Sequence, residues 1–88
     1  MPAEIILYDG LVSVYRTGVD VWVYVSGSLD ENELLLVNVL NTFMDALEQV
    51  AKGSIDKRSL LENIDLVFLA IDELVDGGYV SAISYTFI

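Results

Sequence analysis

Three stretches near the start of the chain have the two-residue period of a β-strand, in which successive side chains lie on opposite faces. They are Glu4–Tyr8, Leu11–Arg16 and Val19–Ser26. Asp9-Gly10 separates the first two and Thr17-Gly18 the last two, and such dipeptides are typical of tight antiparallel turns. The pattern therefore predicts a three-stranded antiparallel meander over residues 4–27.

The third predicted strand is apolar on both faces. Its odd-numbered valines share one face, which comprises Val19, Val21, Val23 and Val25. Trp22 and Tyr24 lie on the opposite face. Such a strand belongs in the middle of a sheet that is covered on both sides. The other two predicted strands leave one of its edges free and nothing over its second face, so a neighbour is missing from the chain or is supplied by another chain.

A first helix is predicted over residues 30–52. Asp30 is expected to cap its first turn and Gly53 to end it. Its apolar positions, from Leu35 to Val50, cover an arc much wider than the usual stripe of about 100°. A helix of this kind is packed from more than one side.

A second helix is predicted over residues 56–76, with Asp56 as its cap and Gly77-Gly78 as its end. Its expected core face consists of Leu60, Leu61, Ile64, Val67, Phe68, Ile71, Leu74 and Val75. The short connection to the first helix predicts an antiparallel helical hairpin that lies on the sheet. The expected fold class is therefore α+β.

Leu66 and Leu69 stand among acids on the other side of this second helix. Glu62, Asp65 and Glu73 surround them in the helical pattern. An apolar centre with an acidic rim is the arrangement expected of a contact patch for a basic-rimmed partner. The alternative is that the two leucines pack beneath the tail or beneath a segment that the chain lacks.

The tail over residues 79–88, YVSAISYTFI, is rich in residues that favour β-strands. It is either an added strand or an exposed, aggregation-prone end. Because it follows a helix stop, deletion of Ser81–Ile88 is expected to leave the helicity unchanged.

The amino-acid composition excludes several classes of function. With 14 acids against 4 bases, the net charge of −10 opposes direct binding to nucleic acid or to an anionic membrane surface. The chain has no cysteine and no histidine, so disulfides, zinc fingers and histidine-based catalysis are excluded, and an intracellular location is expected. No signal peptide and no apolar run of about 20 residues is present, so no membrane insertion is expected.

Three groups of acidic or glycine residues are candidates for a metal, catalytic or phosphate site. They are Asp30 with Glu31 and Glu33, Asp72 with Glu73 and Asp76, and Asp76-Gly77-Gly78. The first lacks the ligand spacing of a calcium loop and is explained by helix capping. The second has no indicated cleft, and the third ends a helix where a phosphate loop would open one. We therefore expect no catalytic residue, cofactor, metal or small-molecule substrate.

Trp22, Tyr24 and Tyr15 can be interpreted as a base-stacking platform of the kind that RNA-binding sheets use. Without basic residues nearby, the pattern favours a core or partner interface instead.

Three motifs in order, YDGLVSVYR, VDVWVYVSGS-x-x-ENELLLVNVL and DKRSLLENIDLVFLAIDELVDGG, resemble the zeta subunits of coatomer. These are small longin-fold subunits of the COPI vesicle coat. The resemblance covers about Glu4 to Gly78, and the tail departs from it. It implies a strand–strand–helix unit, absent here, that would lie beside Val19–Ser26 and over the second face of the sheet. The chain is thus expected to be an incomplete longin domain.

The resemblance also implies a function. The chain would be non-enzymatic and would pair with the large gamma subunit of coatomer in retrograde Golgi-to-ER and intra-Golgi transport. It would be cytoplasmic, peripheral on Golgi membranes and on COPI-coated vesicles through the coat. The alternative is a sigma-type small subunit of a clathrin adaptor, which would bind dileucine sorting signals.

Overall fold

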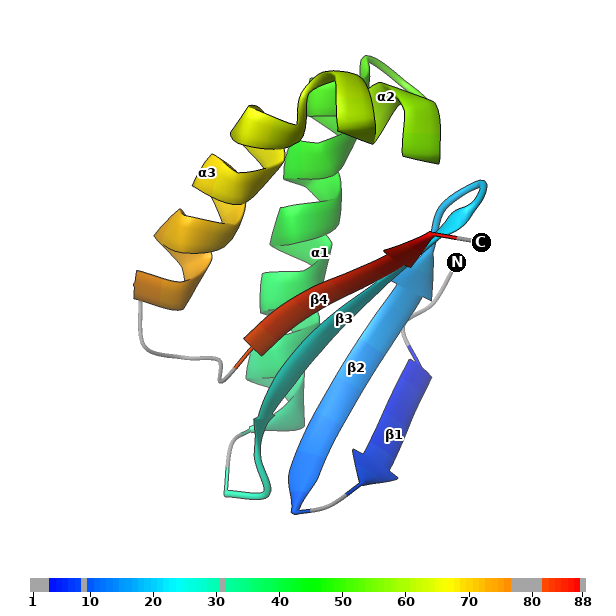
Figure 1. Cartoon of the computed structure of the whole chain (residues 1–88). Coiled ribbons are helices and arrows are strands. Elements are labelled where there is room, and N and C mark those ends of the chain that lie inside the picture. The colour runs from blue at the N-terminus through cyan, green and yellow to red at the C-terminus, as the bar shows by residue number, and fades with distance from the viewer. Residues whose placement is uncertain (1–3, 9, 31, 77–81, 88) are drawn as a thin grey trace.

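One antiparallel sheet carries the helices on one of its sides (Figure 1). The computed structural model describes residues 4–8, 10–30, 32–76 and 82–87. The elements in chain order are β1 (Glu4–Tyr8), β2 (Leu11–Thr17), β3 (Val21–Ser28), α1 (Glu33–Ala51), α2 (Lys57–Glu62), α3 (Ile64–Asp76) and β4 (Ala82–Phe87). This architecture confirms the predicted α+β class.

The first three strands form the antiparallel meander that the sequence predicts. Tyr8 pairs with Leu11 across a two-residue turn, where Gly10 has a φ of 75°, a conformation that glycine adopts without strain. β3 starts at Val21, because the turn back from β2 takes up the residues before it. Val19 is 73% exposed in that turn, so the expectation that it joins the buried valines is wrong.

A fourth strand, β4, pairs with the edge of β3 that the first three strands leave open. The register runs from Val21 opposite Phe87 to Ser26 opposite Ala82. The sequence left two possibilities for the tail, and residues 82–87 are an added strand. Residues 79–81 and 88 lie outside the described part of the chain. The expected three strands thus become four, and the open edge of β3 gains a neighbour.

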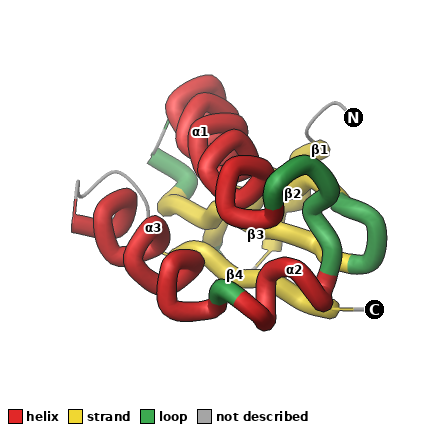
Figure 2. Tube along the Cα trace, turned by 90° about the horizontal axis from the view of Figure 1, so that it is seen from above, coloured by secondary structure: helices red, strands yellow, loops and turns green. Residues whose placement is uncertain are grey.

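The core lies between α1 and one face of the sheet. Valines of β2 and β3 meet larger apolar side chains of the helices there. Each core residue is at most 4% exposed: Val12, Val14, Val21, Val23, Val25, Leu36, Leu40, Phe43, Met44, Leu47, Leu60 and Val67. α1 contacts β2 and β3, whereas α3 contacts α1 and β4, so the two helices lie side by side (Figure 2). In the part of the chain that is described, no helix covers the opposite face of the sheet (Figure 1).

The first helix starts later than its pattern suggests. The side chain of Asn32, and not that of Asp30, caps it, because Asn32 Oδ1 accepts a hydrogen bond from the backbone N–H of Leu34 at 2.9 Å. Asp30 lies in the turn that follows β3. At the other end Lys52 takes a left-handed conformation with a φ of 56°, and Gly53 follows it. The helix thus runs over Glu33–Ala51, where the sequence pattern predicts residues 30–52.

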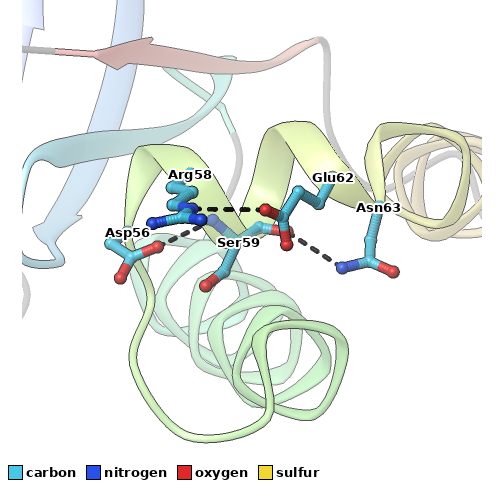
Figure 3. A network of polar contacts seen from close by, with 5 residues as sticks. All are labelled: Asp56, Arg58, Ser59, Glu62 and Asn63. Carbon is cyan, nitrogen blue, oxygen red and sulfur yellow. Dashed lines mark hydrogen bonds and ion pairs between the residues drawn. The ribbon is translucent and has the colours of Figure 1, made fainter.

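Asn63 divides the single helix predicted over residues 56–76 into α2 and α3. Its backbone N–H donates to Leu60 O at 3.2 Å and ends α2, while its backbone oxygen accepts from Val67 N–H at 3.2 Å and begins α3. Its side-chain Nδ2 donates to the backbone oxygen of Ser59 at 3.0 Å (Figure 3). Asparagine side chains bond to nearby backbone groups in this way, which favours helix ends over helix interiors.

The second part of the divided helix, α3, buries a narrower face than its pattern predicts. Val67 is 2% exposed, but Leu61 of α2 is 47%, Phe68 49% and Val75 38% exposed. α3 lies over the edge strand β4 and has α1 on one flank, so only one strip of its broad apolar arc meets the core. The expectation that Leu61, Phe68 and Val75 belong to the core is therefore wrong.

Candidate functional site

Leu66 and Leu69 lie at an open groove between α3 and α1. Leu66 is 47% exposed and Leu69 is 56% exposed, so both are outside the core. The groove has a volume of about 320 Å³, and Ala46, Gln49 and Val50 of α1 form its second wall. The two leucines thus face a shallow, mostly apolar surface that two helices build together.

The α1 wall was not found from the sequence, although a signal for it exists. Residues 46, 49 and 50 have the spacing of one helix face, as do residues 66, 69, 70 and 73 of α3. Two such sets on antiparallel helices are expected to face each other. In α1 this set is hidden, because the apolar arc of the helix is so wide that no single stripe stands out.

The structure brings together two of the three predicted rim acids. Glu73 lines the groove itself. Asp65 is exposed on α3 four residues before Leu69, and is therefore its neighbour on the helix surface. Glu62 belongs to α2, beyond the break at Asn63, and its carboxylate pairs with Arg58 Nε at 3.3 Å (Figure 3). The rim beside Leu66 and Leu69 is thus formed by acids of α3, whereas Glu62 is paired with Arg58.

Further acids lie on the α1 side. Asp45, Glu48, Gln49 and Gly53 line a neighbouring depression of about 420 Å³, and Gln49 is shared between it and the groove. Carboxylates therefore flank the apolar floor from α1 and from α3. Such a surface can receive apolar side chains that have cationic neighbours.

Tyr15, Trp22 and Tyr24 form an aromatic cluster on the sheet face opposite α1. The rings of Tyr15 and Trp22 stack with centroids 5.4 Å apart and planes 14° apart. The ring of Tyr24 lies 5.7 Å from that of Tyr15 and 6.4 Å from that of Trp22. All three residues are half-buried. On this face the hydroxyls of Ser13 and Ser26 also share a hydrogen bond of 2.7 Å.

This aromatic cluster is a separate surface from the groove. Trp22 and Tyr24 are on one side of the sheet, whereas Leu66 and Leu69 are among the helices on the other side. Arg16 is opposite Val23 in the strand register, and its NH1 donates to Asn41 Oδ1 of α1 at 2.9 Å. Its side chain therefore lies on the face of the sheet that carries the helices. No basic residue occupies a described strand position on the aromatic face, which does not favour a base-stacking role.

The acidic candidates for a chemical site can be compared with the structure at their described residues. In the described ranges, no group of three or more acidic, histidine or cysteine side chains can hold a metal ion. Asp30, Glu33, Asp72 and Glu73 are exposed on the surface. Glu31, the side chain of Asp76 and the Gly77-Gly78 pair fall outside the described residues.

By length and composition alone, α1 is apolar enough to cross a membrane. In the folded chain Leu36, Leu40 and Leu47 of this helix are buried against the sheet. These residues of α1, together with Phe43 and Met44, belong to the core of the fold.

Comparison with known proteins gives a family and a set of relatives. The clathrin adaptor complex small chain family matches residues 1–88. Coatomer subunit zeta-1 of Homo sapiens is 49% identical over 78 residues, which are 89% of this chain and 44% of that protein. Coatomer subunit zeta-1 of Oryza sativa subsp. japonica is 46% identical over the same shares. Coatomer subunit zeta-2 of Mus musculus is 44% identical over 89% of this chain and 38% of its own length.

The chain thus spans less than half the length of these relatives. The match to the family, however, extends over the whole sequence, and the α+β fold agrees with an incomplete longin-like small chain. The chain therefore belongs to the clathrin adaptor complex small chain family, and within it the chain is similar to coatomer zeta subunits.

Proposed function

We propose that the chain acts as a non-enzymatic small subunit of a COPI-type vesicle coat and pairs with the large gamma subunit. In this role it takes part in retrograde Golgi-to-ER and intra-Golgi transport. It is cytoplasmic and is held peripherally on Golgi membranes through the coat. The similarity to coatomer zeta subunits over 89% of the chain supports this role.

The proposal that the chain binds a partner rests on the groove at Leu66 and Leu69. Two large apolar side chains that are about half exposed, on a floor extended by α1, are costly to leave in water and gain free energy when a partner covers them. Acids stand on both sides of this floor, and the chain has a net charge of −10. The partner surface is therefore apolar in its centre and basic at its rim.

Capture of purified large-subunit fragments tests this proposal. The chain is immobilised and offered a gamma coatomer trunk fragment and, separately, the large chain of a clathrin adaptor. We expect gamma to be retained and Leu66→Ser with Leu69→Ser to weaken its capture about tenfold or more, which corresponds to about 1.4 kcal/mol. Recovery of the clathrin-adaptor chain alone would instead support the sigma-type role, with its dileucine signals.

A matched pair of exposed leucines provides the control. Leu29 and Leu34 are 59% and 65% exposed beside the start of α1, away from the groove. Leu29→Ser with Leu34→Ser removes at least as much exposed leucine surface and should leave capture unchanged. If both double variants weaken capture equally, the groove is not the contact surface.

The aromatic face is proposed as a second contact surface. Trp22 and Tyr24 are half-buried and no described helix covers them. The relatives are more than twice as long as the matched region, so a further segment is available in them to cover this face. Co-expression of the chain with the unmatched part of a zeta relative, followed by size exclusion, is expected to give a complex that Trp22→Ser weakens.

A further inference from the structure

One edge of the sheet is unprotected. Within the described residues, β4 pairs with β3 on one side and with no strand on the other. A free strand edge presents unpaired N–H and C=O groups, and proteins usually protect it with lysine, proline or a bulge. The sequence of β4, AISYTF, contains neither a charge nor a proline. The edge therefore carries none of these residue-type protections.

The charge distribution singles out this edge. The chain has a net charge of −10, so two copies repel each other over most of their surface. Residues 77–88 include no charged residue at all, whereas β1, the other edge strand, begins with Glu4. β4 therefore brings no like-charged side chains to a contact with a second β4.

The exposed flank of α3 lies on the same side of the molecule. Leu66 and Ala70 face α1 across the groove, and Phe68 is about 160° around the helix from Leu66 at 3.6 residues per turn. Phe68 and Val75 are seven residues apart, so they share this second flank, and they are 49% and 38% exposed. Because α3 also contacts β4, the flank that points away from α1 lies beside the free edge of the sheet (Figure 2).

From the free edge of β4, its lack of charge and the exposed flank of α3, we propose that a second copy of this chain docks along β4. The two β4 strands pair antiparallel about a two-fold axis and join the two four-stranded sheets into one. Phe68 and Val75 of the two copies then meet beside the joint and lose their contact with water. The interface uses the flank of α3 that is turned away from Leu66 and α1, so the partner proposed above can occupy the groove at the same time.

Sedimentation velocity of the 88-residue chain tests the proposal. We expect a dimer whose fraction rises with protein concentration and with salt, because ions screen the repulsion between copies, with a Debye length of about 10 Å at 0.1 M falling to about 3 Å at 1 M. Phe68→Ser should raise the dimer dissociation constant about tenfold or more. Leu66→Ser, which removes a similarly exposed side chain from the flank that faces α1, should not change it.

A second pair of variants tests the strand itself. Thr86 of β4 and Thr17 of β2 both stand opposite Trp22 in the sheet register, one on the edge strand and one on an interior strand. Thr86→Asp adds a negative charge from each copy to the strand that forms the joint and should abolish the dimer. Thr17→Asp adds the same charge away from the axis and should retain it.

Amide hydrogen exchange of the unmodified chain decides the outcome even if a variant fails to fold. The amides of β4 that do not bond to β3 should exchange more slowly as protein concentration rises. A monomer at every concentration and salt level would overturn the proposal. So would a dimer that is lost with Leu66→Ser and kept with Phe68→Ser, or β4 exchange that is independent of concentration.

Discussion

Asp20 and Lys57 join two turns that lie far apart in the sequence. Oδ1 of Asp20 accepts a hydrogen bond from the backbone N–H of Lys57 at 2.6 Å. Beside it, the backbone N–H of Val19 donates to the backbone oxygen of Ile55 at 2.9 Å. A Cβ at Gly18 would collide with that same oxygen. The turn between β2 and β3 therefore holds the start of α2 in place by direct backbone contact.

Gly18→Ala is expected to lower the free energy of unfolding by about 1–3 kcal/mol, the usual cost of inserting a methyl group into a packed site. The atom that has to move is a backbone oxygen of Ile55, which cannot rotate away as a side chain can. Urea unfolding followed by circular dichroism measures the change. Ser54→Ala, at an exposed position in the same loop, should stay within about 0.5 kcal/mol. Equal stability of the two variants would contradict the contact.

Two large side chains on neighbouring helices should respond differently to truncation. Leu40 is fully buried, and Leu40→Ala is expected to cost about 2–5 kcal/mol of stability. Phe68 is 49% exposed, so Phe68→Ala should cost about 1 kcal/mol or less. Thermal unfolding of both variants checks the difference. A Phe68 variant as unstable as the Leu40 variant would show that Phe68 belongs to the core, as its helical periodicity predicts.

Asp56 should make the stability of the chain depend on pH. The backbone N–H of Ser59 donates to Asp56 Oδ1 at 2.8 Å, and with the Ser59 hydroxyl and Arg58 it lowers the pKa of the Asp56 carboxyl (Figure 3). A carboxyl whose pKa is lower in the folded state stabilises it above the unfolded pKa of about 3.9, and this stabilisation is lost as pH falls through the folded pKa.

Asp56→Asn keeps the acceptor oxygen of the cap and removes the charge. We therefore expect the natural chain to be more stable than this variant near neutral pH, and the difference to shrink as the pH falls toward about 2. Urea midpoints of both proteins across this range measure it. A stability difference that does not change with pH would show that the charge of Asp56 has no part in capping α2.

Removal of β4 should weaken the whole fold, contrary to the expectation drawn from the tail sequence. β4 covers the edge of β3, and its Ile83 and Tyr85 pack against the core. Deletion of Ser81–Ile88 would expose the backbone of the strand that carries Val21, Val23 and Val25. We expect a lower thermal midpoint and increased binding of a hydrophobic dye. Unchanged cooperativity and helicity would instead support the original expectation that this segment is dispensable.

The local elements of this chain are determined by its sequence. The alternation of Val21 and Val23 with Trp22 and Tyr24 predicts an interior strand, and β3 is one. The cap at Asp56 likewise follows from residue type and spacing, since its acceptor is Asp56's own side chain and its donor lies three residues later. Strand period, turn residues and the cap at Asp56 depend on a few neighbouring positions, so they can be predicted without knowledge of the fold.

Which strip of a broad apolar helix becomes buried is decided only by its neighbours. The pattern of α3 treats Val67 and Phe68 alike, yet they are 2% and 49% exposed. The difference arises because α1 lies on one flank of α3 and β4 is an edge strand, so nothing described covers the other flank. The break at Asn63 then sends Glu62 to a separate helix and away from the acids that the pattern grouped with it.

The partners of each element are also tertiary properties. The alternation in Ala82–Phe87 is the same whether the segment pairs or remains free, and only the open edge of β3, about 60 residues earlier in the chain, makes it a strand. The groove wall formed by Ala46, Gln49 and Val50 exists only because α1 and α3 pack side by side. Periodicity specifies which direction a side chain faces, whereas packing between distant segments decides what it meets there.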